Sequence, residues 1–349
     1  MFKLELPKKV EVTELFARDG LQNESIFFPT EAKIWFINQI TELGFPVVEV
    51  SNFSHPVYLP QFKDCEEVLK KIKRKPGTVY KCYGMTDVAM GRAAKAAAEG
   101  YGPDVLCFTF SMTDTHSLRN ASRTREKYWT QIPEYVKVLH DAGIKADFAM
   151  ACVYGCPLTG PVDPQIPLDD IERALEMGCD SATPCDTTGE STPLRTYNFL
   201  SKLREKFPNE DVHVGHFHDS RGMAMANYYT ALLCGVEKLE FSLGQLGGQP
   251  NFIQSHTPGK GTGKNYCPSD ITGNGSTEDG LVMLDEMGIE TGIDIDGVLE
   301  LGRILEHSLE RDLRPYCTKT GRLPKKQENT NWWATPPYRG GWWAYPREK

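Results

Sequence analysis

The chain has 349 residues, a formal net charge of −8 and no long basic tract, which argues against a nucleic-acid-binding protein. No apolar stretch has the length to span a bilayer, and the opening MFKLELPKKV lacks the apolar core of a signal peptide, so we expect no membrane association. The 10 cysteines are scattered, and the closest pair, Cys152 and Cys156, is poorly spaced for a zinc knuckle. Reduced thiols and a cytoplasmic location are therefore expected.

Eight short β-rich runs alternate along the chain with amphipathic segments of helical length. The predicted strands, in chain order, cover residues 11–16, 47–52, 78–84, 105–111, 146–154, 180–186, 212–219 and 238–243. A segment that starts at Thr30 repeats apolar residues at helical spacing, and Thr192 precedes Pro193 as an N-cap does. The sequence STED at 276–279 has the pattern of a capping box at the start of another helix.

Eight strands that are each followed by a helix match the count that closes a parallel barrel. An open, doubly wound sheet is the main alternative, and it should carry a glycine-rich phosphate loop after its first strand. The sequence ARDGLQNE at 17–24 is not that motif. We therefore predict an α/β fold, a (β/α)8 TIM barrel, over residues 1–305.

Two segments depart from this alternation. Residues 247–275 are rich in glycine, and a loop of that length inside a compact domain is usually functional or disordered. Residues 306–349 complete a helix and then carry an aromatic-rich tail with four tryptophans, two tyrosines and three prolines. This tail is too apolar to be free, so we expect it to pack on the barrel or on a neighbouring subunit, in a homodimer or higher homo-oligomer. Alternatively, the tail lines the mouth of the barrel.

The catalytic groups of TIM barrels lie at the carboxyl ends of the strands and in the loops that follow them. Reading only these positions gives a short set of ionisable candidates. They are Arg18 and Asp19 after the first strand, Glu49 in the second, Asp186 at the end of the sixth, and His216 and His218 in the seventh.

The seventh strand reads VGHFHDSRG at 214–222 and predicts a metal site. Alternation along a strand puts His216 and His218 on one face, so a Phe217 that faces the helices leaves both imidazoles in the mouth of the barrel. Asp19 would add a carboxylate and Asn274 a carbonyl oxygen, with positions left open for substrate. A structural role for the two histidines is the alternative.

Arg18 suits a reaction that builds negative charge on an oxygen, because a fixed guanidinium stabilises an enolate as it develops. A salt bridge from Arg18 to Glu49 at the rim of the barrel is the alternative, and the two roles are compatible. Asp186 is either a general base or a cap for the turn that follows it.

Five segments resemble the 3-hydroxy-3-methylglutaryl-CoA (HMG-CoA) lyase family of metal-dependent TIM-barrel enzymes. They are ARDGLQNE at 17–24, GCPLTGPV at 155–162, HFHDSRGMAMAN at 216–227, LGGQP at 246–250 and GNGSTEDGLVMLDEMGIETG at 273–292. The resemblance runs from about residue 9 to residue 305. It implies retro-aldol (Claisen-type) cleavage of a 3-hydroxyacyl-CoA with a tertiary alcohol, which gives acetyl-CoA or a related acyl-CoA and a keto compound.

The same resemblance implies roles for the candidates at the strand ends. The implied ligands of a divalent cation, with Mn²⁺ or Mg²⁺ as the expected ion, are Asp19, His216, His218 and Asn274. Arg18 corresponds to the group that stabilises the enolate, Glu49 to its partner and Asp186 to the acid–base carboxylate.

The chain departs from the family where the lyases carry a cysteine in a GGCPYA-type loop. Gln249 stands at this place, in GGQPNF, and a carboxamide cannot deliver a proton near neutral pH, although it can hydrogen-bond a carboxylate or thioester oxygen. In one explanation Cys267 of the same loop replaces the missing thiol. In a second, water or another acid protonates the enolate and Gln249 reads a different substrate; in a third, the enzyme runs toward condensation. We favour the second, because Cys267 is more simply a surface thiol.

Coenzyme A needs cations for its phosphates, and two segments offer them. Arg119 and Arg123 follow the fourth strand, while Lys260 and Lys264 lie in the glycine-rich loop. Either pair could instead belong to a solvated surface. The sequence GKGTGK lacks the flanking strand and helix of a phosphate-binding P-loop.

Two other functions stay open at this stage. A synthase that condenses an acyl-CoA with a keto acid usually carries a further regulatory domain, and the residues after 305 are too few for one. A non-catalytic acyl-CoA-binding relative would explain the lost cysteine. Retention of the metal-binding set and Arg18 argues against it, because such groups are costly to bury without use.

Overall fold

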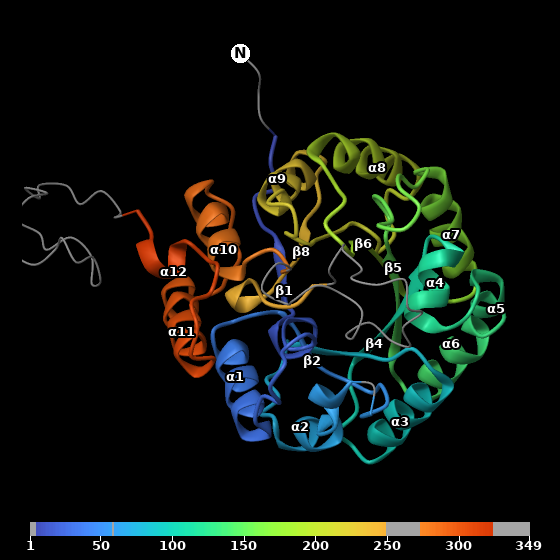
Figure 1. The fold of residues 1–349 in the computed structure, drawn as a ribbon, viewed down its shortest axis with the longest axis horizontal. Coiled ribbons are helices and arrows are strands. Elements are labelled where there is room, and N and C mark those ends of the chain that lie inside the picture. The colour runs from blue at the N-terminus through green and yellow to red at the C-terminus, as the bar shows by residue number, and fades with distance from the viewer. Residues whose placement is uncertain (1–4, 58, 249–272, 324–349) are drawn as a thin grey trace, which may run out of the picture.

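The computed structural model describes residues 5–57, 59–248 and 273–323. Eight parallel strands pair in chain order and close into a barrel, with β1 hydrogen-bonded to both β2 and β8 (Figure 1). The predicted TIM barrel is confirmed and the open sheet is excluded, because closure leaves no sheet edge. The strands are β1 (Glu11–Glu14), β2 (Val47–Asn52), β3 (Val79–Tyr83), β4 (Val105–Ser111), β5 (Lys145–Ala151), β6 (Ser181–Asp186), β7 (Val214–Phe217) and β8 (Lys238–Phe241).

Helices surround the barrel as an outer ring (Figure 1). They are α1 (Thr30–Glu42), α2 (Cys65–Lys71), α3 (Asp87–Ala98), α4 (Asp114–Ala121), α5 (Arg125–Trp129), α6 (Ile132–Asp141), α7 (Gln165–Glu176), α8 (Pro193–Lys206), α9 (Ala224–Leu233), α10 (Thr277–Glu286), α11 (Ile295–Ser308) and α12 (Cys317–Thr320). Short helical turns follow three strands: η1 (Phe16–Gly20), η2 (Pro60–Phe62) and η3 (Leu243–Gln245). In the described ranges, no helix is both long and apolar enough to cross a membrane.

Local sequence signals fix several element ends. β2 and β4 have the predicted bounds, whereas the other six strands differ at one or both ends, where the chain leaves the ladder for a loop. Thr192 caps α8 and Pro193 is its first residue, as predicted. Ser276 caps α10 by accepting a hydrogen bond from the backbone N–H of Asp279. The Asp279 carboxylate accepts from two backbone N–H groups at the start of α12, so it ties α12 to α10.

The chain after residue 305 stays packed on the barrel as far as residue 323. Leu313 is buried, and Arg322 forms ion pairs with Asp285 of α10 and Asp296 of α11. The boundary predicted at residue 305 therefore falls inside α11. The aromatic tail lies outside the described residues.

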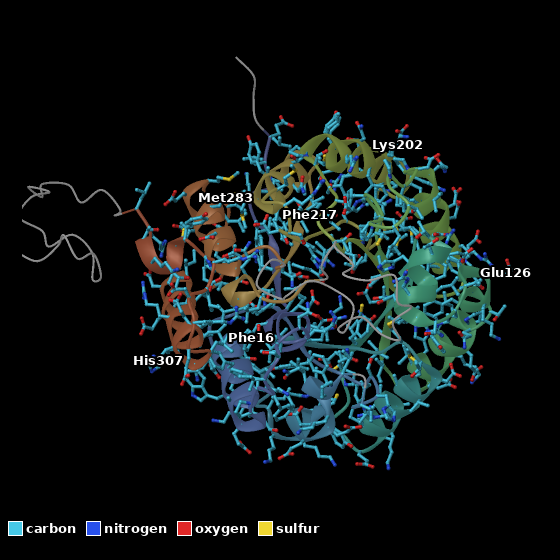
Figure 2. The ribbon with its side chains drawn as sticks, in the orientation of Figure 1. Phe16, Glu126, Lys202, Phe217, Met283 and His307 are labelled. Carbon is cyan, nitrogen blue, oxygen red and sulfur yellow. The ribbon has the colours of Figure 1, made fainter. Side chains whose placement is uncertain are left out.

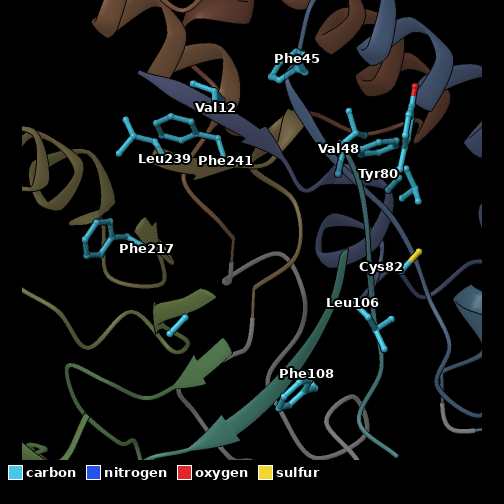
Figure 3. Close-up of a cluster of buried hydrophobic side chains, with 14 of the residues drawn as sticks. Val12, Phe45, Val48, Tyr80, Cys82, Leu106, Phe108, Phe217, Leu239 and Phe241 are labelled. Atoms are coloured by element: carbon cyan, nitrogen blue, oxygen red, sulfur yellow. The ribbon is translucent and has the colours of Figure 1, made fainter. Parts of the chain in front are cut away.

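Outward-facing strand residues form the main core, between the barrel and the helices. Phe217 packs edge-on against Tyr228 of α9, with ring centroids 5.0 Å apart, so its predicted outward orientation is confirmed. Polar and charged side chains such as Glu126, Lys202 and His307 lie at the periphery instead (Figure 2). The buried strand residues labelled in Figure 3 are Val12, Val48, Tyr80, Cys82, Leu106, Phe108, Phe217, Leu239 and Phe241.

The opposite side of the strands faces the barrel axis, and one layer of the side chains on that side is polar. Bulky branched apolar side chains usually fill this layer of a TIM barrel. Here alternation along the strands turns buried polar side chains inward from five strands. They are Lys81, Asp147, Thr183, His216 and Glu240.

Two buried carboxyl groups fasten the segment after β8 to β1 and α10. Glu14 accepts hydrogen bonds from the backbone N–H of Leu243 at 2.8 Å and from the Thr277 hydroxyl at 2.7 Å. Glu278 accepts from the backbone N–H of Gly244 at 2.9 Å. Burial raises the pKa of Glu14 to about 7 and the pKa of Glu278 to about 8. Both side chains are therefore largely protonated in the folded protein at mildly acidic pH.

Replacement of Glu278 by glutamine should flatten the pH dependence of stability. The folded state holds a proton on Glu278 up to about pH 8, whereas the unfolded chain loses it near the ordinary glutamate pKa of 4.5, so the free energy of unfolding falls as pH rises through this window. Between pH 6 and pH 8.5, Glu278→Gln should lose less unfolding free energy than the wild type, by on the order of 1–3 kcal/mol.

Urea denaturation followed by circular dichroism at the two pH values measures this difference. Glu286→Gln, an exposed position of the same helix, is the matched control and should keep the wild-type pH dependence. An unchanged pH dependence in Glu278→Gln would contradict the protonation assigned to this carboxyl group.

Candidate active site

A cavity of about 870 Å³ opens at the carboxyl ends of the strands. One side is charged, with side chains from β2, β3, β7, β8 and η1; the other is neutral, with small side chains from β4, β5 and β6. The charged side consists of Arg18, Asp19, Glu49, Lys81, His216, His218 and Glu240. The neutral side includes Cys107, Thr109, Ala149, Ala151, Thr183 and Cys185.

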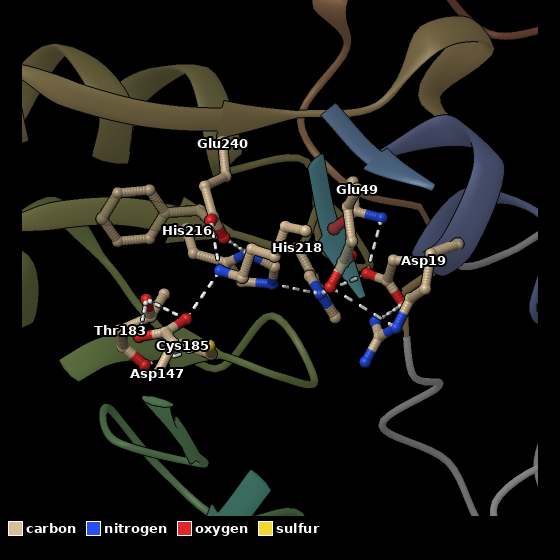
Figure 4. Close-up of polar contacts among 12 residues, drawn as sticks. Asp19, Glu49, Asp147, Thr183, Cys185, His216, His218 and Glu240 are labelled. Carbon is tan, nitrogen blue, oxygen red and sulfur yellow. Dashed lines mark hydrogen bonds and ion pairs between the residues drawn. The ribbon is translucent and has the colours of Figure 1, made fainter. Parts of the chain in front are cut away.

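Asp19, His216 and His218 come together as predicted, and all three are buried. One potential ligand atom from each lies within 4.8 Å of the others. The Nε2 atoms of His216 and His218 face each other at 2.9 Å, and Nε2 of His218 lies 3.6 Å from Oδ2 of Asp19 (Figure 4). Two imidazoles and one carboxylate around a common point are a donor set that fits a divalent transition-metal ion.

The Asp19 carboxylate is held in its ionised form. Burial raises its pKa, but the hydrogen bond from His218 and the charge of Arg18 outweigh burial and keep the pKa well below its usual range. Gly247, in a left-handed backbone conformation after β8, lies directly against the backbone of Asp19, where any side chain would clash. The LGG sequence after β8 therefore lets this loop close over the end of β1.

Asn274 also reaches the site, since it forms an isolated bridge with His218. Its side-chain nitrogen donates to Oδ2 of Asp19 at 2.9 Å and to the Leu246 carbonyl at 2.9 Å. The predicted ligand atom was the carbonyl oxygen, and in this geometry the amide nitrogen is the atom turned toward Asp19. A ligand role for Asn274 stays a prediction and requires the amide to turn.

Arg18 lies beside the triad because η1 turns the chain back over the end of β1. Its Nη1 is 3.1 Å from Asp19 Oδ1, its Nε is 3.7 Å from Glu49 Oε1, and its guanidinium carbon lies 3.9 Å from the centre of the Tyr83 ring. Burial lowers the pKa of Arg18, but Glu49 and Asp19 raise it further, so the guanidinium stays charged. Burial raises the pKa of Glu49 to about 7 even though Arg18 lowers it. The salt bridge from Arg18 to Glu49 that the sequence suggested is present.

Asp186 lies at the end of β6, near the triad but not on the cavity wall. Its Oδ1 accepts a hydrogen bond from the backbone N–H of Ser191 at 3.0 Å, which is the turn-capping role. Its other carboxyl oxygen is buried and has no hydrogen-bond partner among the described residues. Burial raises the pKa of Asp186 to about 7. The turn contact therefore leaves one oxygen for an acid–base role, which stays a prediction.

The arginines expected to bind coenzyme A differ in position. Arg123 lines the cavity, but its guanidinium donates to Gln131 and Tyr135 and stacks on Tyr128 at 3.7 Å. Arg119 is not a cavity-lining residue, and one of its terminal nitrogens is buried without a partner in the described part of the chain. Both phosphate-binding roles stay predictions. The remaining predicted site residues lie outside the described residues: Gln249, Lys260, Lys264 and Cys267.

Three charged residues that the sequence motifs did not single out lie inside the barrel next to the site. Lys81 and Glu240 line the cavity, and Asp147 pairs with Lys81. Burial raises the pKa of Glu240, but Lys81 and His216 outweigh it and bring the pKa down to about 2. The signal was present: each is a charged residue between two apolar neighbours in a strand, and strand alternation turns it away from the outer core.

A closed parallel barrel with a carboxylate–imidazole cluster and a buried guanidinium at its strand ends defines a TIM-barrel enzyme of the metal-binding class. A family model described as HMGL-like matches residues 9–305, and the chain belongs to this family. The resemblance inferred from the sequence is thereby confirmed, and the chain is a carbon–carbon lyase.

Individual relatives agree over most of their length. The HMG-CoA lyase YngG of Bacillus subtilis is 30% identical over 311 residues, which cover 88% of this chain and 95% of that protein. The mitochondrial HMG-CoA lyase of Bos taurus is 33% identical over 305 residues, or 87% of each protein. Among solved structures, an HMG-CoA lyase from Acinetobacter baumannii in complex with coenzyme A and 3-methylmalate has a TM-score of 0.80 at 28% identity, and the match covers 93% of this chain and 98% of that one.

Removal of one imidazole should abolish tight metal binding. His218→Ala should weaken Mn²⁺ binding by about 100-fold or more. Mutation of a residue that only hydrogen-bonds a metal ligand already lowers metal affinity by about 10- to 100-fold, and loss of the ligand itself should cost more. Isothermal titration of the chelator-stripped protein with Mn²⁺ measures the affinity. His213→Ala, a half-buried histidine next to β7 and outside the cavity lining, is the control and should bind Mn²⁺ as the wild type does. Equal binding by His218→Ala would place the cation elsewhere.

Proposed function

We propose that this protein cleaves a 3-hydroxy-3-substituted acyl-CoA of the HMG-CoA type into acetyl-CoA, or a related acyl-CoA, and a keto compound. The curated relatives are HMG-CoA lyases over almost the whole chain. The related structure that holds coenzyme A and 3-methylmalate supports a substrate that joins a coenzyme A thioester to a branched hydroxy acid.

One observation carries this proposal: Arg18 shares a cavity with the Asp19–His216–His218 cluster, at 3.1 Å from Asp19. Carbon–carbon cleavage next to a thioester moves an electron pair onto the thioester oxygen. A charged guanidinium that is already desolvated and fixed stabilises that oxygen without reorganising in the transition state. Glu49 and the Tyr83 ring hold the guanidinium in place from two sides.

The described residues divide the reaction between them. A divalent cation bound by Asp19, His216 and His218 would supply Lewis acidity at the substrate's oxygen atoms. We assign the role of base to Asp186; because it lies off the cavity wall, its unpaired oxygen must turn toward the cavity to take the proton of the tertiary hydroxyl. The bond between the carbinol carbon and the neighbouring carbon then breaks, the hydroxyl carbon becomes a carbonyl, and Arg18 holds the resulting enolate oxygen. An acid or water must then deliver one proton to the enolate carbon, a step for which Gln249 is unsuited.

The finer assignments belong to the same proposal. We propose Mn²⁺ or Mg²⁺ as the ion, with Mn²⁺ favoured because two ligands are imidazoles. We propose a cytoplasmic location, which the free state of the described cysteines supports. We propose a homodimer or higher homo-oligomer on the basis of the aromatic tail.

A substrate panel tests the proposed function. The Mn²⁺-loaded protein should release acetyl-CoA, or a related acyl-CoA, from at least one member of a set of 3-hydroxy-3-carboxyalkyl-CoA thioesters that includes HMG-CoA. Chromatography of the CoA species reports the product. Release of free CoA from acetyl-CoA plus a keto acid would instead identify a synthase, and thioester binding with no turnover would identify a non-catalytic relative.

Loss of the guanidinium should reduce the chemical step and spare metal binding. Arg18→Gln should lower kcat by about 100- to 1000-fold, the range for removal of one oxyanion-stabilising donor. The readouts are the rate of acyl-CoA release and the Mn²⁺ stoichiometry. Arg74→Gln, which removes an arginine outside the cavity lining that pairs with Asp104, should leave both unchanged. Wild-type turnover by Arg18→Gln would refute the role given to Arg18.

A further inference from the structure

Lys81, Asp147 and Glu240 form a buried ionic cluster inside the barrel, next to the candidate metal ligands. Nζ of Lys81 lies 2.6 Å from Oδ2 of Asp147 and 3.2 Å from Oε1 of Glu240. The three residues are only 7%, 2% and 6% exposed, respectively. The proposed reaction uses none of them. Buried charges are costly unless they are paired, so this cluster has a purpose that an apolar barrel interior would not serve.

Glu240 connects this cluster to a metal ligand through its two carboxylate oxygens. Oε1 accepts from Lys81, and Oε2 lies 2.8 Å from Nδ1 of His216. A carboxylate only accepts hydrogen bonds, so Nδ1 of His216 must carry the proton. In a neutral imidazole, which is the form that binds a metal ion, the lone pair is then on Nε2, the atom that faces His218 at 2.9 Å. Figure 4 shows Glu240, His216, His218 and Asp19 in succession across the barrel.

Lys81 and Asp147 keep Glu240 in the orientation that serves His216. Lys81 occupies the oxygen of Glu240 that does not face the imidazole, which stops the carboxylate from turning away. Asp147 holds Lys81 in turn, and it is itself fixed by the hydroxyls of Ser181 at 2.8 Å and Thr183 at 3.2 Å. This chain of contacts takes one or two residues from each of five strands, which are β3, β5, β6, β7 and β8.

We propose that Glu240, with Lys81 and Asp147 behind it, is a positioning relay that sets the tautomer and ring orientation of His216 for the cation. This inference rests on the proposed metal site. None of the three touches the substrate's reacting atoms; they act through His216. A carboxylate behind a metal-binding histidine raises the basicity of the ligand and fixes its direction. The distinctive element is the buried lysine, which gives that carboxylate a partner of opposite charge.

Metal affinity and the tautomer of His216 test the relay without any substrate. Glu240→Leu should weaken Mn²⁺ binding by about 10- to 100-fold in isothermal titration. Lys81→Met should cause a smaller loss. The double variant should bind no more weakly than Glu240→Leu alone, because Lys81 acts through Glu240. Histidine-selective ¹⁵N NMR of the metal-free protein should show His216 protonated on Nδ1 in the wild type, and Glu240→Leu should lose this preference.

Two further variants separate positioning from general damage. Lys238→Met removes a lysine of β8 that pairs with Asp211 outside the cavity lining, so it should keep wild-type metal affinity and the wild-type His216 tautomer, with melting followed by circular dichroism as the folding control. Glu240→Gln preserves shape in case Glu240→Leu does not fold. Lys81 and His216 contact different oxygens of Glu240, and glutamine has an NH2 group, which cannot accept, in place of one of them, so the metal affinity of this variant should also fall.

The outcomes distinguish this inference from the proposed function. Folded Glu240→Gln with wild-type Mn²⁺ affinity and an unchanged His216 tautomer overturns the relay. Independent, additive losses in the double variant overturn the role of Lys81. If wild-type protein and His218→Ala bind Mn²⁺ equally, the metal site itself is wrong and the proposed function falls with it.

Discussion

The pairing of β1 with β8 is the contact on which the site depends. It closes the barrel and brings the end of the first strand beside the end of the seventh, although about 200 residues separate Asp19 from His216 in the chain. The buried carboxyl groups of Glu14 and Glu278 reinforce this closure, because they anchor the turn after β8 to β1 and to α10. Gly247 then allows the same turn to lie against the backbone of Asp19. The position of the triad is thus a consequence of closure.

The interior of the barrel can hold charged side chains because these side chains are paired with groups of opposite charge or with hydrogen-bond donors. Lys81 lies between two carboxylates, Glu240 also faces His216, and Arg18 lies between Asp19 and Glu49. Removing one member would leave a buried ion unpaired, which costs far more than a surface pair is worth. Fixed groups of this kind are preorganised for charge that develops during a reaction, whereas solvent would have to reorient. The paired charges inside the barrel therefore include Arg18, the group to which we assign stabilisation of the enolate.

Several features of the site follow from local pattern alone. Alternation along residues 214–219 predicted that His216 and His218 share a face opposite Phe217, and the packing of Phe217 on Tyr228 agrees. The position of Asp19 and Arg18 at a strand end predicted their place at the mouth of the barrel. The alternation of eight β-rich and helix-like segments predicted the fold. Lys81 and Glu240 could have been found in the same way, because each is a charged residue between two apolar neighbours in a strand.

The sequence by itself determined the barrel and the residue types that meet near the ends of its strands, because these depend on periodicities of two and 3.6 residues within short segments. Tertiary structure alone decided which atoms face each other. It turns the amide nitrogen of Asn274 toward Asp19, commits the guanidinium of Arg123 to protein contacts, and gives one oxygen of Asp186 to the Ser191 backbone. It also makes Lys81 a partner of Glu240, 159 residues away in the chain. Hydrogen-bond partners are chosen among all groups that closure brings together, and no local pattern contains that choice.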